Sequence, residues 1–109
     1  MNINKINKPA VALMCKSHNY EYQPKTNTFI TGDWVISTKR QEELLGENVV
    51  LTEGQKDSAY IGGTIVGFVP AKQTSNKKRY DVVFKPESKF VNNKVTRSIE
   101  FRGNPVQYL

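Results

Sequence analysis

The sequence predicts a mainly β fold of the α+β class: a small, strongly bent sheet or a partly open barrel of five to six strands, with one short helix. Three observations support this prediction. Short apolar or alternating runs, separated by turn residues, recur along the chain as in small β domains. One stretch near residue 40 has helical spacing. Two adjacent glycines, Gly62 and Gly63, interrupt the longest strand-like run, which is how a small barrel turns a corner.

The first half of the chain is expected to contain two strands and the helix. Thr38 is expected to cap that helix, because Gln41 follows three residues later and completes a capping box. Glu42 and Glu43 are expected near the positive end of its dipole, and Gly46 at its left-handed stop. The elements predicted here are a buried strand at 10–15, a long loop at 16–28, a strand at 34–37 and the helix at 38–45.

The second half is expected to consist of strands joined by basic loops. Tyr80, Val82 and Phe84 recur with the two-residue period of a strand, and so do Ile99 and Phe101. The predicted elements are strands at 49–52 and 59–69 with a loop at 53–58 between them, a basic hairpin loop at 72–78, a strand at 79–85, a loop at 86–93, a strand at 96–102 and a closing strand at 106–109.

Length and composition predict one cytoplasmic domain. The chain of 109 residues is expected to form a single unit, 1–109, with a flexible start at 1–8. The single cysteine, Cys15, excludes an intramolecular disulfide and favours a reducing compartment. No apolar run approaches the roughly 18–20 residues of a membrane span, so no membrane association is expected. The oligomeric state stays open.

Positive charge is concentrated late in the chain. The formal net charge is +6, and residues 71–109 hold nine lysines and arginines against three acids, whereas residues 25–70 hold four bases against six acids. A concentrated positive field attracts phosphate or another polyanion, because neutralising that charge releases counterions. The charge pattern therefore favours a polyanionic partner, with a solvated basic surface as the alternative.

Two segments resemble a known superfamily. Gly32-Asp33-Trp34-Val35 is a turn that leads into a strand, and Gly62-Gly63-Thr64-Ile65-Val66-Gly67-Phe68 is a glycine-interrupted strand. This arrangement over residues 30–85 resembles the PUA-like superfamily, which includes the ASCH, EVE and YTH-type domains. The resemblance implies a small β-barrel that binds RNA or DNA, and EVE and YTH-type domains hold one modified or flipped base in an aromatic pocket. This chain lacks the extra helices that often flank that pocket.

The candidate site combines the late cations with aromatic rings outside the predicted core. Tyr20 and Tyr22 lie in a polar stretch, and Tyr60 lies beside glycines, so these phenols are candidates for base stacking. Trp34 is expected to anchor the core or to close a base pocket. Phe84 and Phe101 are expected in the core. The predicted nucleic-acid-binding residues are Lys72, Lys77, Lys78, Arg79, Lys85, Arg97, Arg102, Tyr20, Tyr22 and Trp34.

No catalytic residues, metal ligands or cofactors are predicted. Cys15 and His18 would need hydrogen-bond contact and a third group to act as nucleophile and base, and residues three apart at a strand end tend to point to opposite faces. One cysteine and one histidine cannot supply a metal site without carboxylates. The acids at 42–57 are expected to be helix-terminal or solvated charges.

These observations favour a non-enzymatic nucleic-acid-binding module that contacts nucleic acid through a basic hairpin surface. Recognition of a flipped or modified base is an additional hypothesis. The alternative is a small basic interaction protein of the phage or mobile-element type that docks on an acidic protein surface, because electrostatic complementarity steers that association equally well. An ASCH-type enzyme acting on nucleosides or RNA is a third hypothesis. Sequence does not distinguish DNA from RNA.

Overall fold

The computed structural model describes residues 9–15, 20–54, 56–71, 79–101 and 103–109. The predicted flexible start at 1–8 and the basic hairpin loop at 72–78 lie outside the described residues. The elements in chain order are β1 (Val11–Met14), β2 (Tyr20–Gln23), β3 (Thr28–Trp34), α2 (Thr38–Leu44), β4 (Asn48–Thr52), β5 (Ala59–Pro70), β6 (Tyr80–Pro86), the 3-10 turns η1 (Ser88–Phe90) and η2 (Lys94–Ser98), and β7 (Val106–Tyr108).

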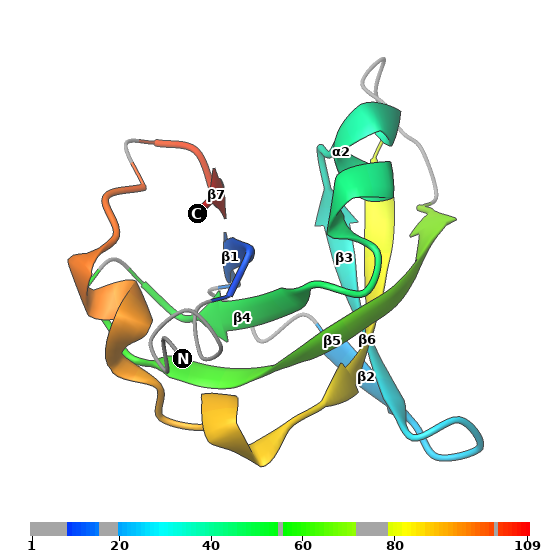
Figure 1. The fold of residues 1–109 in the computed structure, drawn as a ribbon, viewed down its shortest axis with the longest axis horizontal. Helices are drawn as coiled ribbons and strands as arrows, with labels where there is room; N and C mark the ends of the chain where they lie inside the picture. The colour runs from blue at the N-terminus through cyan, green and yellow to red at the C-terminus, as the bar shows by residue number, and fades with distance from the viewer. Residues whose placement is uncertain (1–8, 16–19, 55, 72–78, 102) are drawn as a thin grey trace, which may run out of the picture.

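The strands form one strongly bent sheet that does not close. Their order is β2-β3-β6-β5-β4-β1-β7, with β1 and β4 parallel and the other neighbours antiparallel. Figure 1 shows the long, curved β5 running through both halves of the sheet, with β6, β3 and β2 at one end and β4, β1 and β7 at the other. The prediction of a mainly β, α+β fold with a bent sheet and one short helix is confirmed.

The paired glycines lie where β5 changes partners. β5 pairs with β4 through residues 59–64 and with β6 through residues 63–70. A Cβ on Gly62 would lie 2.5 Å from the carbonyl oxygen of Val49 on β4, and one on Gly63 would overlap the backbone of Lys85 on β6. Both neighbouring strands therefore approach β5 too closely for any side chain at these two positions, which agrees with the predicted bend.

Two clusters of buried residues form the core. The main cluster contains Val11, Leu13, Cys15, Trp34, Ile36, Leu44, Val49, Leu51, Ile65, Val82, Phe84 and Val106. The second contains Ala12, Val50, Ala59, Phe90 and Phe101. Because side chains alternate between the faces of a strand, β1 and β4 contribute to both clusters and are buried on both faces. The expectation that Phe84 and Phe101 are core residues is confirmed, since they are 0% and 1% exposed.

Two predicted boundaries in the first half are wrong. The expected loop at 16–28 contains β2, which forms a hairpin with β3 around a turn in which Asn27 has a φ of 53°. The polar residues and Pro24 favour a loop in the sequence. An edge strand tolerates polar residues, and Pro24 lies in the turn that follows β2. Gly32 and Asp33, read as a turn before a strand at 34–37, instead lie inside β3, which ends at Trp34. The described residues form a sheet of seven strands, where five to six were expected.

The predicted strand at 96–102 is also wrong. Lys94–Ser98 is the 3-10 turn η2, and Thr96 is held there because its Oγ1 donates a hydrogen bond to the carbonyl of Asp57 at 2.5 Å. Ile99 and Phe101 nevertheless pack on the second cluster. Two side chains spaced two residues apart can be buried from an irregular segment as well as from a strand. The spacing of Ile99 and Phe101 therefore does not distinguish the two.

The helix forms where the sequence predicts it, but its cap differs. Ser37, not Thr38, is the N-cap, and its Oγ accepts a hydrogen bond from the backbone N–H of Arg40 at 3.2 Å. Glu42 and Glu43 consequently lie in the second half of α2, away from the positive end of its dipole. Gly46 has a φ of 84°, the left-handed stop that the sequence predicts.

The helix connects the two ends of the bent sheet. Its Arg40 guanidinium lies 4.2 Å from the centre of the Tyr108 ring on β7, although α2 follows directly from β3. Within the described residues, no helix has both the length and the apolar character needed to cross a membrane.

Candidate binding pocket

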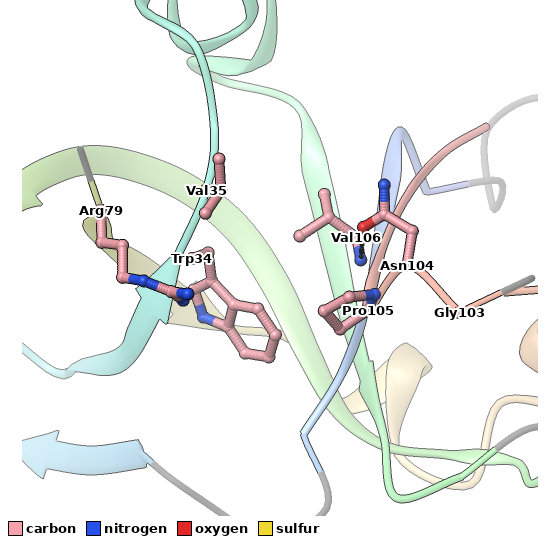
Figure 2. A pocket seen from close by; sticks show the side chains of 7 residues that line it. All are labelled: Trp34, Val35, Arg79, Gly103, Asn104, Pro105 and Val106. Atoms are coloured by element: carbon pink, nitrogen blue, oxygen red, sulfur yellow. Dashed lines mark hydrogen bonds between the residues drawn. The ribbon is translucent and has the colours of Figure 1, made fainter. Parts of the chain in front are cut away.

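A cavity of about 470 Å³ lies where the sheet fails to close. Its walls come from the end of β3, from the residue that precedes β6, and from the segment that leads into β7. Figure 2 shows Trp34, Val35 and Arg79 on one side and Asn104, Pro105 and Val106 on the other. The lining residues are Trp34, Val35, Arg79, Gly103, Asn104, Pro105 and Val106.

A β-bulge directs Trp34 toward the interior. Thr31 pairs with Val82 and Trp34 pairs with Tyr80, so three steps along β3 match two steps along β6. Thr31 is fully buried. Because Trp34 is three residues further on, a regular strand would place its side chain on the face opposite to that of Thr31. The bulge therefore keeps the indole on the core side, where it is 6% exposed.

The indole nitrogen of Trp34 is an unsatisfied donor. Nε1 is closed off from solvent and has no hydrogen-bond acceptor in the part of the chain that the structure describes. Leaving a buried donor unpaired costs about 1–3 kcal/mol. Because such groups are rare in native proteins, its acceptor is expected outside the described side chains, in the rest of the chain, a water molecule or a ligand.

The Arg79 guanidinium lines the same side of the pocket. Figure 2 shows it beside the indole in this view. A guanidinium and an indole N–H both donate, so neither can satisfy the other. Arg79 also has a partner within the protein, but its five N–H donors can serve that partner and a ligand at once.

Three acceptors of the opposite wall are engaged within the protein. The backbone N–H of Val106 donates to Asn104 Oδ1 at 3.0 Å, and Gln107 Nε2 donates to the Asn104 carbonyl at 3.4 Å. The backbone N–H of Met14 donates to the carbonyl of Pro105 at 2.8 Å. None of the described lining residues is acidic. The pocket thus has the Arg79 guanidinium as the cationic donor of one wall, and it suits a ligand with acceptor atoms.

Of the ten residues predicted for nucleic-acid binding, the pocket brings together Trp34 and Arg79. Trp34 combines the two roles expected of it, since it belongs to the main core cluster and also lines a pocket. Lys72, Lys77, Lys78 and Arg102 lie outside the described residues.

The tyrosines form a separate aromatic group. Tyr20 packs against Phe29 and Tyr60, with ring centres 5.5 and 5.8 Å away, and is half-buried. Tyr22 is 46% exposed, and its Oη donates to Asn27 Oδ1 at 2.8 Å. Tyr22 pairs with Phe29 near the start of β3, whereas Trp34 ends that strand. Tyr22 therefore offers the more accessible ring, away from the pocket.

Tyr60 has a structural role. Its Oη donates a hydrogen bond to the carbonyl of Cys15 at 3.1 Å, and burial raises the pKa of this phenol well above its usual value. Cys15 is buried, and its Sγ lies 3.8 Å from Thr31 Oγ1. His18, which with Cys15 would have formed the nucleophile–base pair that the sequence does not favour, lies outside the described residues.

The described late cations occupy different parts of the molecule. Lys85 is exposed near the end of β6, six residues from Arg79, a span of about 20 Å at ~3.3 Å per strand residue. Lys89 is partly neutralised by Glu87, at 3.4 Å. Arg97 is exposed in η2, the orange turn of Figure 1, which lies across the molecule from β6. Neither Lys85 nor Arg97 lines the pocket.

Sequence reasoning missed the far wall of the pocket. The turn Gly103-Asn104-Pro105 is recognisable from its composition, but nothing in it indicates that it faces Trp34. Among the described residues, no group of three or more His, Cys, Asp or Glu side chains is arranged to hold a metal ion.

A search of family models, of curated proteins and of solved structures finds no match to this chain.

Proposed function

We propose that this protein is a non-enzymatic nucleic-acid-binding module of PUA-like build, in which one base enters the pocket between the wall of Trp34 and Arg79 and the wall of Asn104 and Pro105, while basic residues of 72–79 contact phosphates. The observation that carries the proposal is the Arg79 guanidinium in a pocket with apolar walls, beside the indole of Trp34, in a chain with a net charge of +6. Free Cys15 supports a cytoplasmic location.

The pocket has a size and a lining that suit a base. Small-ligand sites commonly measure about 300–1,000 Å³ and combine apolar walls with a few polar groups. A volume of about 470 Å³ falls within that range, and Trp34, Val35, Pro105 and Val106 provide the apolar walls. Bases present acceptor atoms on their edges, and the Arg79 guanidinium can donate hydrogen bonds to such atoms.

The proposal is tested by titrating a fluorescently labelled single strand of DNA or RNA at several salt concentrations. Each phosphate neutralised on a single strand contributes about −0.7 to the slope of log K against log salt. Replacing Lys77, Lys78 and Arg79 by Ala together is expected to weaken binding and to flatten this slope by up to ~2.

A matched control removes the same charge elsewhere. Lys25, Lys39 and Lys56 are exposed and lie in the acidic part of the chain, so a triple Ala variant at these positions is expected to retain most of the slope. Equal losses in the two triple variants would mean that net charge alone attracts the strand. Absence of salt-sensitive binding to any strand would contradict the proposed function.

An acidic protein partner is the second candidate. A register shift between Ile65 and Gly67 reverses the alternation along β5, so that Val69, which pairs with Asp81, lies on the face away from Ile65 and the core. Val66, which lies within this shift, and Val69 are each 46% exposed. Lys85 lies on the same face, opposite Thr64. Exposed apolar side chains near a cation suit a protein surface with apolar and acidic groups. A protein that fails to bind every strand in the titration would favour this candidate.

A further inference from the structure

We propose that a second copy of this chain docks on the outer face of β3 and β6, so that the protein forms a two-fold symmetric dimer. The outer face is the side of the sheet that points away from the main core cluster, and it carries Glu21, Ile30, Val69, Val83 and Lys85. The inference goes beyond the proposed function, because none of these residues lines the pocket.

Ile30 and Val83 form an apolar pair at the centre of the outer face. They lie directly opposite each other in the β3–β6 ladder. Their chain neighbours Thr31 and Phe84 are fully buried on the core side, so alternation directs Ile30 and Val83 to the other side of the sheet. Both are partly buried, and neither belongs to either core cluster.

The 3-10 turns cover this side of the sheet at its other end. Phe90 of η1 packs with Val50 in the second cluster, and a Cβ on Gly62 would lie 2.8 Å from the Cβ of Phe90. Figure 1 shows η1 and η2 at the β4 end of β5. Val66 and Val69, toward the other end of β5, are each 46% exposed. The apolar groups of the outer face thus lie outside both clusters that the described residues form.

Two opposite charges lie on either side of the apolar pair. Glu21 pairs with Ile30 across the β2–β3 hairpin, about 5 Å away by strand spacing. Lys85 is two residues beyond Val83 on β6, about 7 Å away. Both charged side chains are exposed, and within the described residues neither takes part in an ion pair. A face with one charge of each sign is complementary to itself, which favours a second copy over a uniformly acidic partner.

A two-fold axis parallel to the outer face brings these charges together. When the axis passes between Ile30 and Val83, diagonal to the strands, Glu21 of one copy lies over Lys85 of the other, and the reciprocal contact forms at the same time. The two apolar pairs then meet at the centre. Strands of the two copies cross at roughly 70°, nearer to the orthogonal class of sheet packing than to the aligned one. Because the face is small, we expect a weak, concentration-dependent dimer.

The test is sedimentation velocity of the whole protein without nucleic acid, from low micromolar to millimolar concentration. Salt at about 0.15 M screens the long-range repulsion between two chains of net charge +6. E21K and K85E each place like charges opposite each other, and each is expected to weaken the dimer roughly 10-fold. A 1:1 mixture of the two variants restores opposite charges at both contacts, so it is expected to dimerise about as well as the parent chain.

Matched controls make the same changes in net charge on α2. E42K and K39E are at exposed positions of the helix, and their mixture is expected to dimerise no better than either variant alone. V83T keeps a β-branched residue in the strand but replaces a methyl group with a hydroxyl, so it should also weaken the dimer. Thermal unfolding establishes that each variant is folded, and the concentration dependence of the parent chain tests the inference without any substitution.

The contrary outcomes are specific. A parent chain that stays monomeric over the whole range would overturn the inference and leave the outer face to an unlike protein. A dimer that E21K and K85E do not weaken, or a mixture no stronger than its components, would exclude the pairing of Glu21 with Lys85. Because no nucleic acid is present, each of these outcomes is independent of the proposed function.

Discussion

Trp34 on β3 pairs with Tyr80 on β6 at the end of the β3–β6 ladder. From the preceding pair, Thr31 and Val82, the chain advances three residues on β3 but only two on β6. The extra residue on β3 keeps the indole on the buried face. Arg79 directly precedes Tyr80, so the same pairing that positions the indole also brings the guanidinium to the pocket. The bulge therefore sets the geometry on which the proposed site depends.

Gly32 lies within this bulge, against the neighbouring strand β6. A Cβ at this position would overlap the carboxylate of Asp81 on the neighbouring strand. G32A is expected to lower the free energy of unfolding by about 1–3 kcal/mol, the usual cost of overpacking, and to change the emission of the single tryptophan. The matched control is G67A, because a Cβ on Gly67 meets no atom within 4 Å. Urea unfolding followed by fluorescence measures both variants, and equal stability of the two would contradict this role for Gly32.

Ser37 is expected to matter more to α2 than Thr38. S37A removes the acceptor of the Arg40 backbone N–H and should cost about 1 kcal/mol of stability, whereas T38A should have a smaller effect. Thermal unfolding of the two variants measures the difference. A larger loss for T38A would mean that the capping box predicted from the sequence forms in solution.

Glu87 is expected to make stability depend on acid pH. A hydrogen bond from Thr64 holds the pKa of this carboxyl below its ordinary value of 4.5, with a smaller contribution from Lys89. Since the pKa is lower in the folded state, the stabilisation is present above pH 4.5 and is lost as the pH falls through the folded value.

The measurement is the urea midpoint of the wild type and of E87Q at pH 7 and at pH 3. The variant is expected to be less stable at pH 7, and the difference should shrink at pH 3, because pH 3 is below the ordinary pKa of 4.5 and the stabilisation by the charged carboxyl is reduced there. E42Q, at an exposed position on α2, corrects for the change in net charge. A difference that is the same at both pH values would exclude this role for Glu87.

The sequence predicted the elements that depend on local pattern. The buried strand at 10–15, the glycine bend of β5, the strand ending near Lys85 and the position of the helix follow from periodicity and turn chemistry. The pattern does not reveal the β2–β3 hairpin, because β2 is polar and lies at the edge of the sheet. It predicts a strand in place of η2, because Ile99 and Phe101 are spaced two residues apart.

The candidate site was only half predictable. Trp34 and Arg79 were named from their residue types, but their meeting depends on a strand register that a dipeptide such as Gly32-Asp33 does not reveal. The wall at Asn104 and Pro105 depends on how β7 returns to β1, which is a long-range contact. Such contacts are set by tertiary packing, not by the local sequence.

The most direct test of the account is the indole N–H signal of Trp34 in a ¹H–¹⁵N correlation spectrum. The chain has one tryptophan, so this signal needs no assignment by mutation. Adding a single strand of DNA or RNA that the protein binds is expected to shift it, because a base in the pocket changes the surroundings of the indole. An indole signal that stays in place at saturation, while backbone amides elsewhere shift, would contradict binding in this pocket.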